Sequence, residues 1–90
     1  MSNLFEKMIK WLDTESISYH LENKYLIHYN ALGYEVFRIV DLGKCLYVLC
    51  LGGTYVCKEF PNGEIEEIIK LAIEDGERED WEEIHGVDNE

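Results

Sequence analysis

Apolar residues recur at helical spacing near the start of the chain. Between residues 3 and 13 they follow the i, i+3, i+4 period of an amphipathic helix: Leu4, Phe5, Met8, Ile9, Trp11 and Leu12. Asn3 comes just before this stripe, and Glu6 stands three residues after Asn3, which is the pattern of a capping box. The pattern predicts a helix over residues 3–13 with Asn3 as its N-cap.

A second helical stripe lies in the last third of the chain. Its apolar members are again spaced by three and four residues: Ile65, Ile68, Ile69, Ala72 and Ile73. We expect a helix over residues 63–75 that Asn62 caps and Gly76 ends. Glu66 and Lys70 are one turn apart in it and are expected to pair.

Between the two stripes the apolar period changes to two, which is typical of strands. Short turn signals separate five such runs: 17–22, 25–30, 34–41, 45–51 and 54–60. Strands joined by turns this short must pair antiparallel, because parallel neighbours need long crossovers. The sequence therefore predicts an α+β fold: a five-stranded antiparallel β-meander with a helix at each end, in the order α-β-β-β-β-β-α, and both helices on one sheet face.

The last two predicted strands are apolar on both faces. If Gly52 and Gly53 form the turn, Cys50 opposes Tyr55, and one face carries Leu46, Val48, Cys50, Tyr55 and Cys57. The other face then carries Tyr47, Leu49, Leu51, Val56 and Phe60. An antiparallel sheet with one wet face normally alternates between apolar and polar residues, so the second face needs its own cover.

A second copy of the chain is the expected cover for that face. Tyr47 and Tyr55 are the aromatic candidates for contacts with a partner, because tyrosine combines an apolar ring with a polar tip. The alternative is that these rings only fill a small core and its rim. The sequence predicts a homodimer that forms through the sheet.

Composition adds a strong charge asymmetry. The 90 residues include 8 Lys+Arg and 19 Asp+Glu, for a net charge of −11. Residues 1–63 hold seven acids and six bases, whereas residues 64–90 hold twelve acids and two bases, so the sums are −1 and −10. We expect one α+β domain over residues 1–76 and an acidic, partly flexible C-terminal tail over residues 77–90.

The negative charge narrows the choice of partners. Binding to nucleic acid or to an anionic membrane surface needs Lys and Arg, so we expect neither as a direct partner. The expected partner is a protein, including a basic protein that itself binds nucleic acid. One interpretation of the acidic segment is solubility; the other is a docking surface whose carboxylates imitate phosphates. The residues of that surface are Glu66, Glu67, Glu74, Asp75, Glu77, Glu79, Asp80, Glu82 and Glu83, with Trp81 as an embedded aromatic contact.

The sequence carries no recognisable catalytic, cofactor or metal motif. Its three cysteines, Cys45, Cys50 and Cys57, lie in apolar runs and are expected to be reduced, buried thiols. His20 and His28 are expected on opposite faces of the first hairpin, so we do not expect them to share a metal ion. We expect no catalytic activity, no cofactor and no metal.

These observations predict a small, acidic, cytoplasmic protein-binding module. The start of the chain lacks the pattern of a secretory signal, and no run is long enough to span a membrane. The alternative is an inhibitor of a nucleic-acid-processing protein that acts through residues 64–90. In size and acidity the chain resembles phage-encoded inhibitors that mimic DNA.

Overall fold

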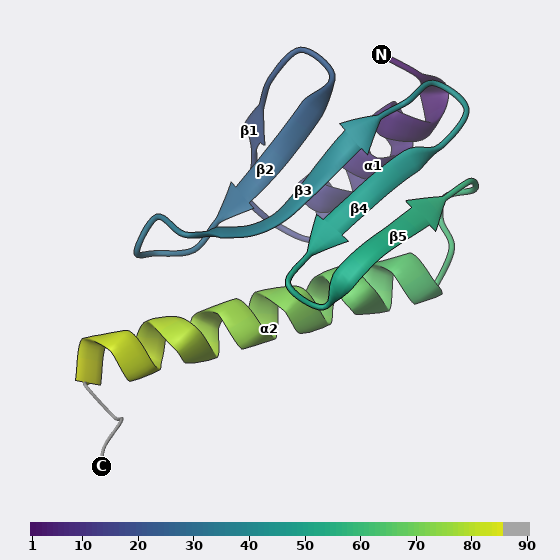
Figure 1. Cartoon of the computed structure of the whole chain (residues 1–90). Coiled ribbons are helices and arrows are strands. Elements are labelled where there is room, and N and C mark those ends of the chain that lie inside the picture. Colours follow the sequence, from purple (N-terminus) through teal and green to yellow (C-terminus); the bar gives the residue numbers. More distant parts are fainter. Residues whose placement is uncertain (86–90) are drawn as a thin grey trace.

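The chain forms one five-stranded sheet with a helix at each end. The computed structural model describes the backbone of residues 1–85 and the side chains of residues 1–77. The elements follow the predicted order: α1 (Asn3–Thr14), β1 (His20–Leu21), β2 (Tyr25–Tyr29), β3 (Glu35–Asp41), β4 (Leu46–Cys50), β5 (Gly53–Cys57) and α2 (Glu64–His85). Figure 1 shows the sheet as an antiparallel meander in the spatial order β1-β2-β3-β4-β5. The predicted fold, with one helix, five antiparallel strands and a second helix, is confirmed.

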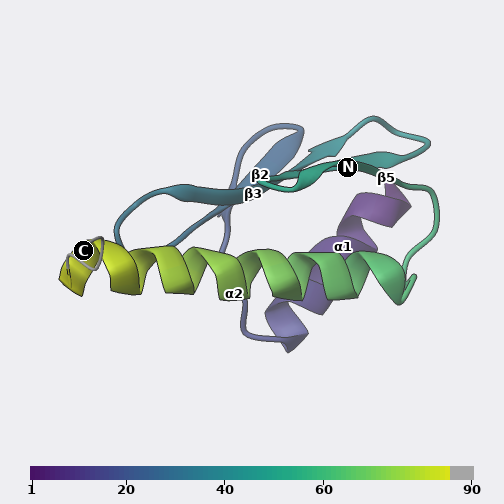
Figure 2. The same cartoon turned by 60° about the horizontal axis from the view of Figure 1, so that its bottom comes forward.

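Both helices lie on the same face of the sheet, as Figure 2 shows. The core lies between the helices and the sheet, because the buried residues of both layers form one cluster. Helix α1 contributes Phe5, Met8 and Leu12, and α2 contributes Ile65 and Ile69. The sheet contributes one side chain from alternate positions of its strands: Leu26, Phe37, Ile39, Leu46, Val48 and Cys57.

The first helix is capped by Ser2 and not by Asn3, which corrects the predicted boundary. The Ser2 hydroxyl accepts a hydrogen bond from the Phe5 N–H (3.1 Å). The carboxylate of Asp41 in turn accepts hydrogen bonds from the Ser2 N–H (2.9 Å) and the Ser2 hydroxyl (2.8 Å). A contact with the end of β3 therefore selects the capping residue, and the local capping-box pattern does not.

The same helix ends in a Schellman motif centred on Ser16. The Ile17 N–H donates to the Leu12 carbonyl (2.9 Å), and the Ser16 N–H donates to the Asp13 carbonyl (3.1 Å). Ser16 has a φ of 59°, in the left-handed region that glycine usually occupies at this position. The motif turns the chain out of the helix and leaves only His20 and Leu21 in β1, shorter than the predicted 17–22.

The second helix begins as predicted but does not end at Gly76. The Asn62 side chain accepts hydrogen bonds from the N–H groups of Glu64 and Ile65 (both 3.1 Å), so its capping role is confirmed. The helix then runs through Gly76 to His85. A Cβ on Gly76 would stand 3.0 Å from Cγ2 of Val36, so a glycine at this position leaves room for the Val36 side chain of β3. This glycine serves packing and not helix termination. The division into a domain over 1–76 and a flexible tail over 77–90 stays a prediction.

Two predictions about the last strand differ from the structure. The β4–β5 turn is Leu51-Gly52, because Cys50 pairs with Gly53 and Val48 with Tyr55. This register differs from the predicted one by two residues, so the paired side chains of β4 and β5 keep their predicted faces, whereas Leu51 lies in the turn. Phe60 is 4% exposed and packs edge-on against Trp11 (centroids 5.6 Å apart), because β5 ends at Cys57 and the chain then crosses to the helix layer.

Lys70 makes contacts with α1 in place of the expected pair with Glu66. Its ammonium lies 3.4 Å from a carboxylate oxygen of Glu15 and 5.9 Å from the centroid of the Trp11 ring. The Glu66 carboxylate accepts hydrogen bonds from the backbone N–H groups of Asn62 and Gly63. Lys70 thus links α2 to α1, whereas Glu66 binds the backbone at the start of α2. Among the described residues, no helix is both long enough and apolar enough to cross a membrane.

Candidate functional site

Among the residues that the structure describes, no helix or strand covers the sheet face that turns away from both helices. We call it the outer face and define it by two cross-strand rows. The register places Tyr25, Val40, Tyr47 and Val56 side by side in the first row. The second row consists of Ile27, Arg38, Leu49 and Thr54. Six of these eight side chains are apolar or aromatic, and the first row is so along its whole length.

The outer face is partly exposed, and its exposure is highest in β4 and β5. Val56 is 50% exposed and Tyr47 is 40% exposed, whereas Ile27 is 5% exposed. Arg38 is the one charged residue in the two rows. Its guanidinium lies 5.1 Å from the centroid of the Tyr25 ring and donates two hydrogen bonds to Glu35 (3.0 and 3.2 Å). The hydrogen bonds to Glu35 raise the pKa of Arg38 further above its usual value.

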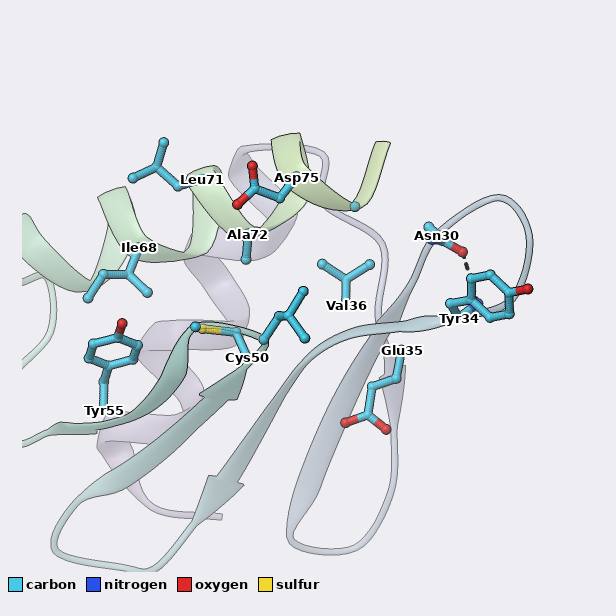
Figure 3. Close-up of a pocket in the computed structure, with 13 residues that line it drawn as sticks. Asn30, Tyr34, Glu35, Val36, Cys50, Tyr55, Ile68, Leu71, Ala72 and Asp75 are labelled. Atoms are coloured by element: carbon cyan, nitrogen blue, oxygen red, sulfur yellow. Dashed lines mark hydrogen bonds between the residues drawn. The ribbon is translucent and has the colours of Figure 1, made fainter. Parts of the chain in front are cut away.

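A second open surface lies between α2 and one end of the sheet. It is a groove of about 240 Å³ between α2, the β4–β5 turn and the start of β3. Its aliphatic lining consists of Val36, Leu51, Ile68, Leu71 and Ala72. Figure 3 shows Ile68 and Ala72 of α2 opposite Tyr55, Cys50 and Val36 of the sheet. Sequence reasoning missed this groove, because its lining comes from segments that are far apart in the chain.

The β2–β3 turn forms one end of the groove through Asn30. The Asn30 side-chain oxygen accepts hydrogen bonds from the backbone N–H groups of Leu32 (3.1 Å) and Tyr34 (2.9 Å), as Figure 3 shows for Tyr34. Gly33 completes the turn with a φ of 88°. Glu35 also borders the groove, but its carboxylate points away from α2 and binds Arg38. The Asn30 side chain thus stabilises the turn, and the Glu35 side chain binds Arg38.

Three large apolar residues at the groove are exposed to solvent. Leu51 is 83% exposed, Leu71 is 51% exposed, and Tyr34 is 49% exposed. Carboxylates surround Leu71 on the surface of α2, because Glu67, Glu74 and Asp75 stand three or four residues from it. An apolar surface beside concentrated negative charge is therefore the chemical character of the groove.

The other groups with shifted pKa values have structural causes. Burial raises the pKa of the Cys57 thiol, and a hydrogen bond to Asp13 (2.9 Å) raises the pKa of Tyr19. Burial acts to raise the pKa of Asp41, but hydrogen bonds from the Ser2 and Gly43 N–H groups and the Ser2 hydroxyl outweigh it. The pKa of Asp41 is therefore below its usual value.

The described cysteines and histidines differ in burial and in the neighbours that they contact. Cys57 is buried as predicted, but Cys45 and Cys50 are only half-buried, and Cys50 lines the groove. His20 pairs with Glu22, whereas His28 stacks on the Phe37 ring with centroids 5.1 Å apart. In the described part of the chain, no three His, Cys, Asp or Glu side chains are grouped to hold a metal ion.

The predicted contact residues fall into three groups. Tyr47 lies on the outer face, and Tyr55 lies on the opposite face, half-buried beside α2. The first part of α2 carries five of the predicted acids: Glu66, Glu67, Glu74, Asp75 and Glu77. The Glu66 carboxylate accepts a hydrogen bond from the Asn62 N–H at the start of the helix. The side chains of Glu79, Asp80, Trp81, Glu82 and Glu83 lie outside the described residues, although their backbone is part of α2.

Comparisons with known proteins add no relative. No protein-family model, no curated protein and no solved structure matches this chain.

Proposed function

We propose that the chain is a small, cytosolic, non-catalytic protein-binding module that forms a homodimer through its outer face. The observation that carries the proposal is the uncovered row of Tyr25, Val40, Tyr47 and Val56 on the side of the sheet away from both helices. Burial of exposed apolar area contributes roughly 25 cal/mol per Å², so a row of this kind favours association. A two-fold dimer would use the same row from both copies.

The distribution of charge favours a second copy as the occupant. Residues 1–63, which include the whole outer face, sum to only −1, so the face itself does not repel its copy. The acidic α2 lies in the opposite layer. Two sheets that pack face to face stand about 10 Å apart, so the two α2 helices, each behind its own sheet, would be separated by more than the Debye length of about 8 Å at physiological salt.

The mass in solution tests the dimer. Light scattering at tens of micromolar is expected to show twice the 10.6 kDa of one chain. Tyr47→Lys and Val56→Lys each place an unpaired charge in the interface of both copies and are expected to weaken the dimer by at least about a hundredfold. Leu42→Lys is the matched control, because Leu42 is 51% exposed and lies outside the outer face.

A monomeric mass for the unmodified chain at these concentrations would overturn the homodimer. A dimer that survives both lysine substitutions would overturn the outer face as its interface. Circular dichroism of each variant separates a lost interface from a lost fold.

A second candidate function is the inhibition of a nucleic-acid-processing protein by mimicry of DNA. The continuous α2 favours it, because a helix of 22 residues is about 33 Å long. Its acids are Glu64, Glu66, Glu67, Glu74, Asp75, Glu77, Glu79, Asp80, Glu82 and Glu83. Ten acids over that length average roughly one per 3.3 Å of helix axis, and one DNA strand has a phosphate per about 3.4 Å of its axis. The acids form two groups on either side of the acid-free stretch 68–73, so the likeness is in mean charge density and not in regular spacing.

Salt dependence separates the two functions. A complex held by the acidic segment should weaken steeply between low and physiological salt, whereas association through the apolar outer face should change little. If Gln and Asn replace the acids of residues 74–83 without change in the affinity or salt dependence of a captured partner, mimicry is excluded.

A further inference from the structure

The groove beside α2 has the size of one side chain and not of a substrate. An engineered apolar cavity of about 150 Å³ holds a benzene molecule, whereas pockets for drug-sized ligands begin at about 300 Å³. The volume of about 240 Å³ lies between these limits. The groove therefore fits a leucine, phenylalanine or tryptophan side chain presented by a larger molecule.

The surroundings of the groove specify the charge of that molecule. Leu71 lies at the groove with Glu67, Glu74 and Asp75 one turn away from it on α2. The thirteen lining residues include two acids and no Lys or Arg. Another copy of this chain, at −11, is the wrong occupant, and so is the chain's own segment 86–90, which has two acids and no base. A segment with positive charge around an apolar side chain is complementary to both features.

We infer that this groove is the docking site for a basic segment of a partner protein that inserts one bulky apolar side chain between α2 and the β4–β5 turn. Ile68, Ala72 and Val36 form the apolar contact, and Leu51 and Leu71 close over the inserted side chain. The carboxylates of α2 attract the surrounding Lys and Arg and orient the segment along the helix. The inference rests on the proposed protein-binding function and names the partner class for a surface separate from the dimer face.

Three short synthetic peptides provide the probe. The first has a central tryptophan among lysines, the second replaces the tryptophan by serine, and the third replaces the lysines by glutamates. Calorimetry with the full chain is expected to give at least about tenfold tighter binding for the first peptide than for either of the others. If the serine peptide binds as tightly as the first peptide, charge alone explains the binding. That result would overturn the groove as the docking site for an apolar side chain.

Protein variants and the chain's own thiols locate the binding. Leu71→Gln keeps every charge and is expected to weaken binding of the first peptide by about tenfold. Leu42→Gln is the matched control, because Leu42 is also 51% exposed but lies outside the groove and the outer face. Val56→Gln tests whether the peptide binds the outer face instead. Cys50 lines the groove and Cys45 does not, although both are half-buried. The bound peptide should slow alkylation of Cys50, read by mass spectrometry, and leave Cys45 unchanged.

The same samples separate the inference from the function on which it rests. If the Val56→Gln variant loses the peptide while Leu71→Gln keeps it, the partner binds the outer face, so the groove inference falls and the binding module stands. If no peptide binds and the chain remains a dimer, only the inference falls. If no peptide binds and the chain is monomeric, both fall.

Discussion

The outer face and the groove are both apolar and open, but the chain builds them in different ways. The outer face comes from consecutive antiparallel strands, and its rows follow from register alone. The groove needs α2, the β4–β5 turn and the start of β3 to meet. The electrostatic settings also differ, because the outer face lies in the nearly neutral part of the chain and the groove lies beside acidic α2. One small core therefore supports two open surfaces that differ in the charge around them.

The largest expected effect tests whether the two surfaces share one folding unit. Ile69→Ala removes a side chain that is 0% exposed between α2 and the sheet, and it should lower the free energy of unfolding by about 2–4 kcal/mol. Urea unfolding measures the loss, and dimerisation and peptide binding should disappear in the same transition. Leu71→Ala, at a half-exposed site on the same helix, should cost less than about 1 kcal/mol. Separate transitions for the two surfaces would contradict a single core.

A smaller effect should reach the groove and spare the outer face. Gly76→Ala gains about 1 kcal/mol of helix propensity, but its Cβ would stand 3.0 Å from the stiff Val36 side chain, and such overpacking costs about 1–3 kcal/mol. We expect a net loss of about 1 kcal/mol in urea unfolding and weaker peptide binding, with an unchanged dimer mass. Glu77→Ala, one residue further along, should change stability by less than about 0.5 kcal/mol. Stabilisation by Gly76→Ala would mean that α2 does not pack on Val36.

A change at the end of α1 should affect neither surface. Ser16 has a φ of 59°, so Ser16→Gly relieves left-handed strain and should raise the free energy of unfolding by about 0.5–1 kcal/mol. Lys10→Gly, inside the same helix, should lower it by about 0.7 kcal/mol. Thermal unfolding compares the two variants, and a loss of stability in Ser16→Gly would count against the Schellman motif.

The smallest expected effect depends on pH and also spares both surfaces. The pKa of Asp41 is lower in the folded chain than in the unfolded one, so its stabilising contribution is present above the unfolded value of about 4 and is lost as the pH falls through the folded value. Asp41→Asn should therefore destabilise at neutral pH and differ less from the unmodified chain near pH 2. A difference that stays constant from neutral to acidic pH would show that the carboxylate charge has no part in holding Ser2.

Local patterns predicted the elements but not which long-range partners adjust their ends. The capping box at Asn3 and Glu6 was a reasonable local interpretation, yet Asp41, thirty-nine residues from Ser2, selects Ser2. Lys70 stands one turn from Glu66 but contacts Glu15 and Trp11, because α1 crosses beside α2. Such choices depend on tertiary contacts that no window of local sequence contains.

Periodicity and turn spacing along the chain were enough to predict the order of the helices and strands, the antiparallel meander and the two faces of the paired strands. Periodicity is a local property, and the short turns leave no other pairing. Three features depend on contacts between distant segments: α2 continues past Gly76, Phe60 joins the core, and Leu51 and Leu71 line one groove. The physical reason is close packing, since the neighbour that fills each space comes from a distant part of the chain.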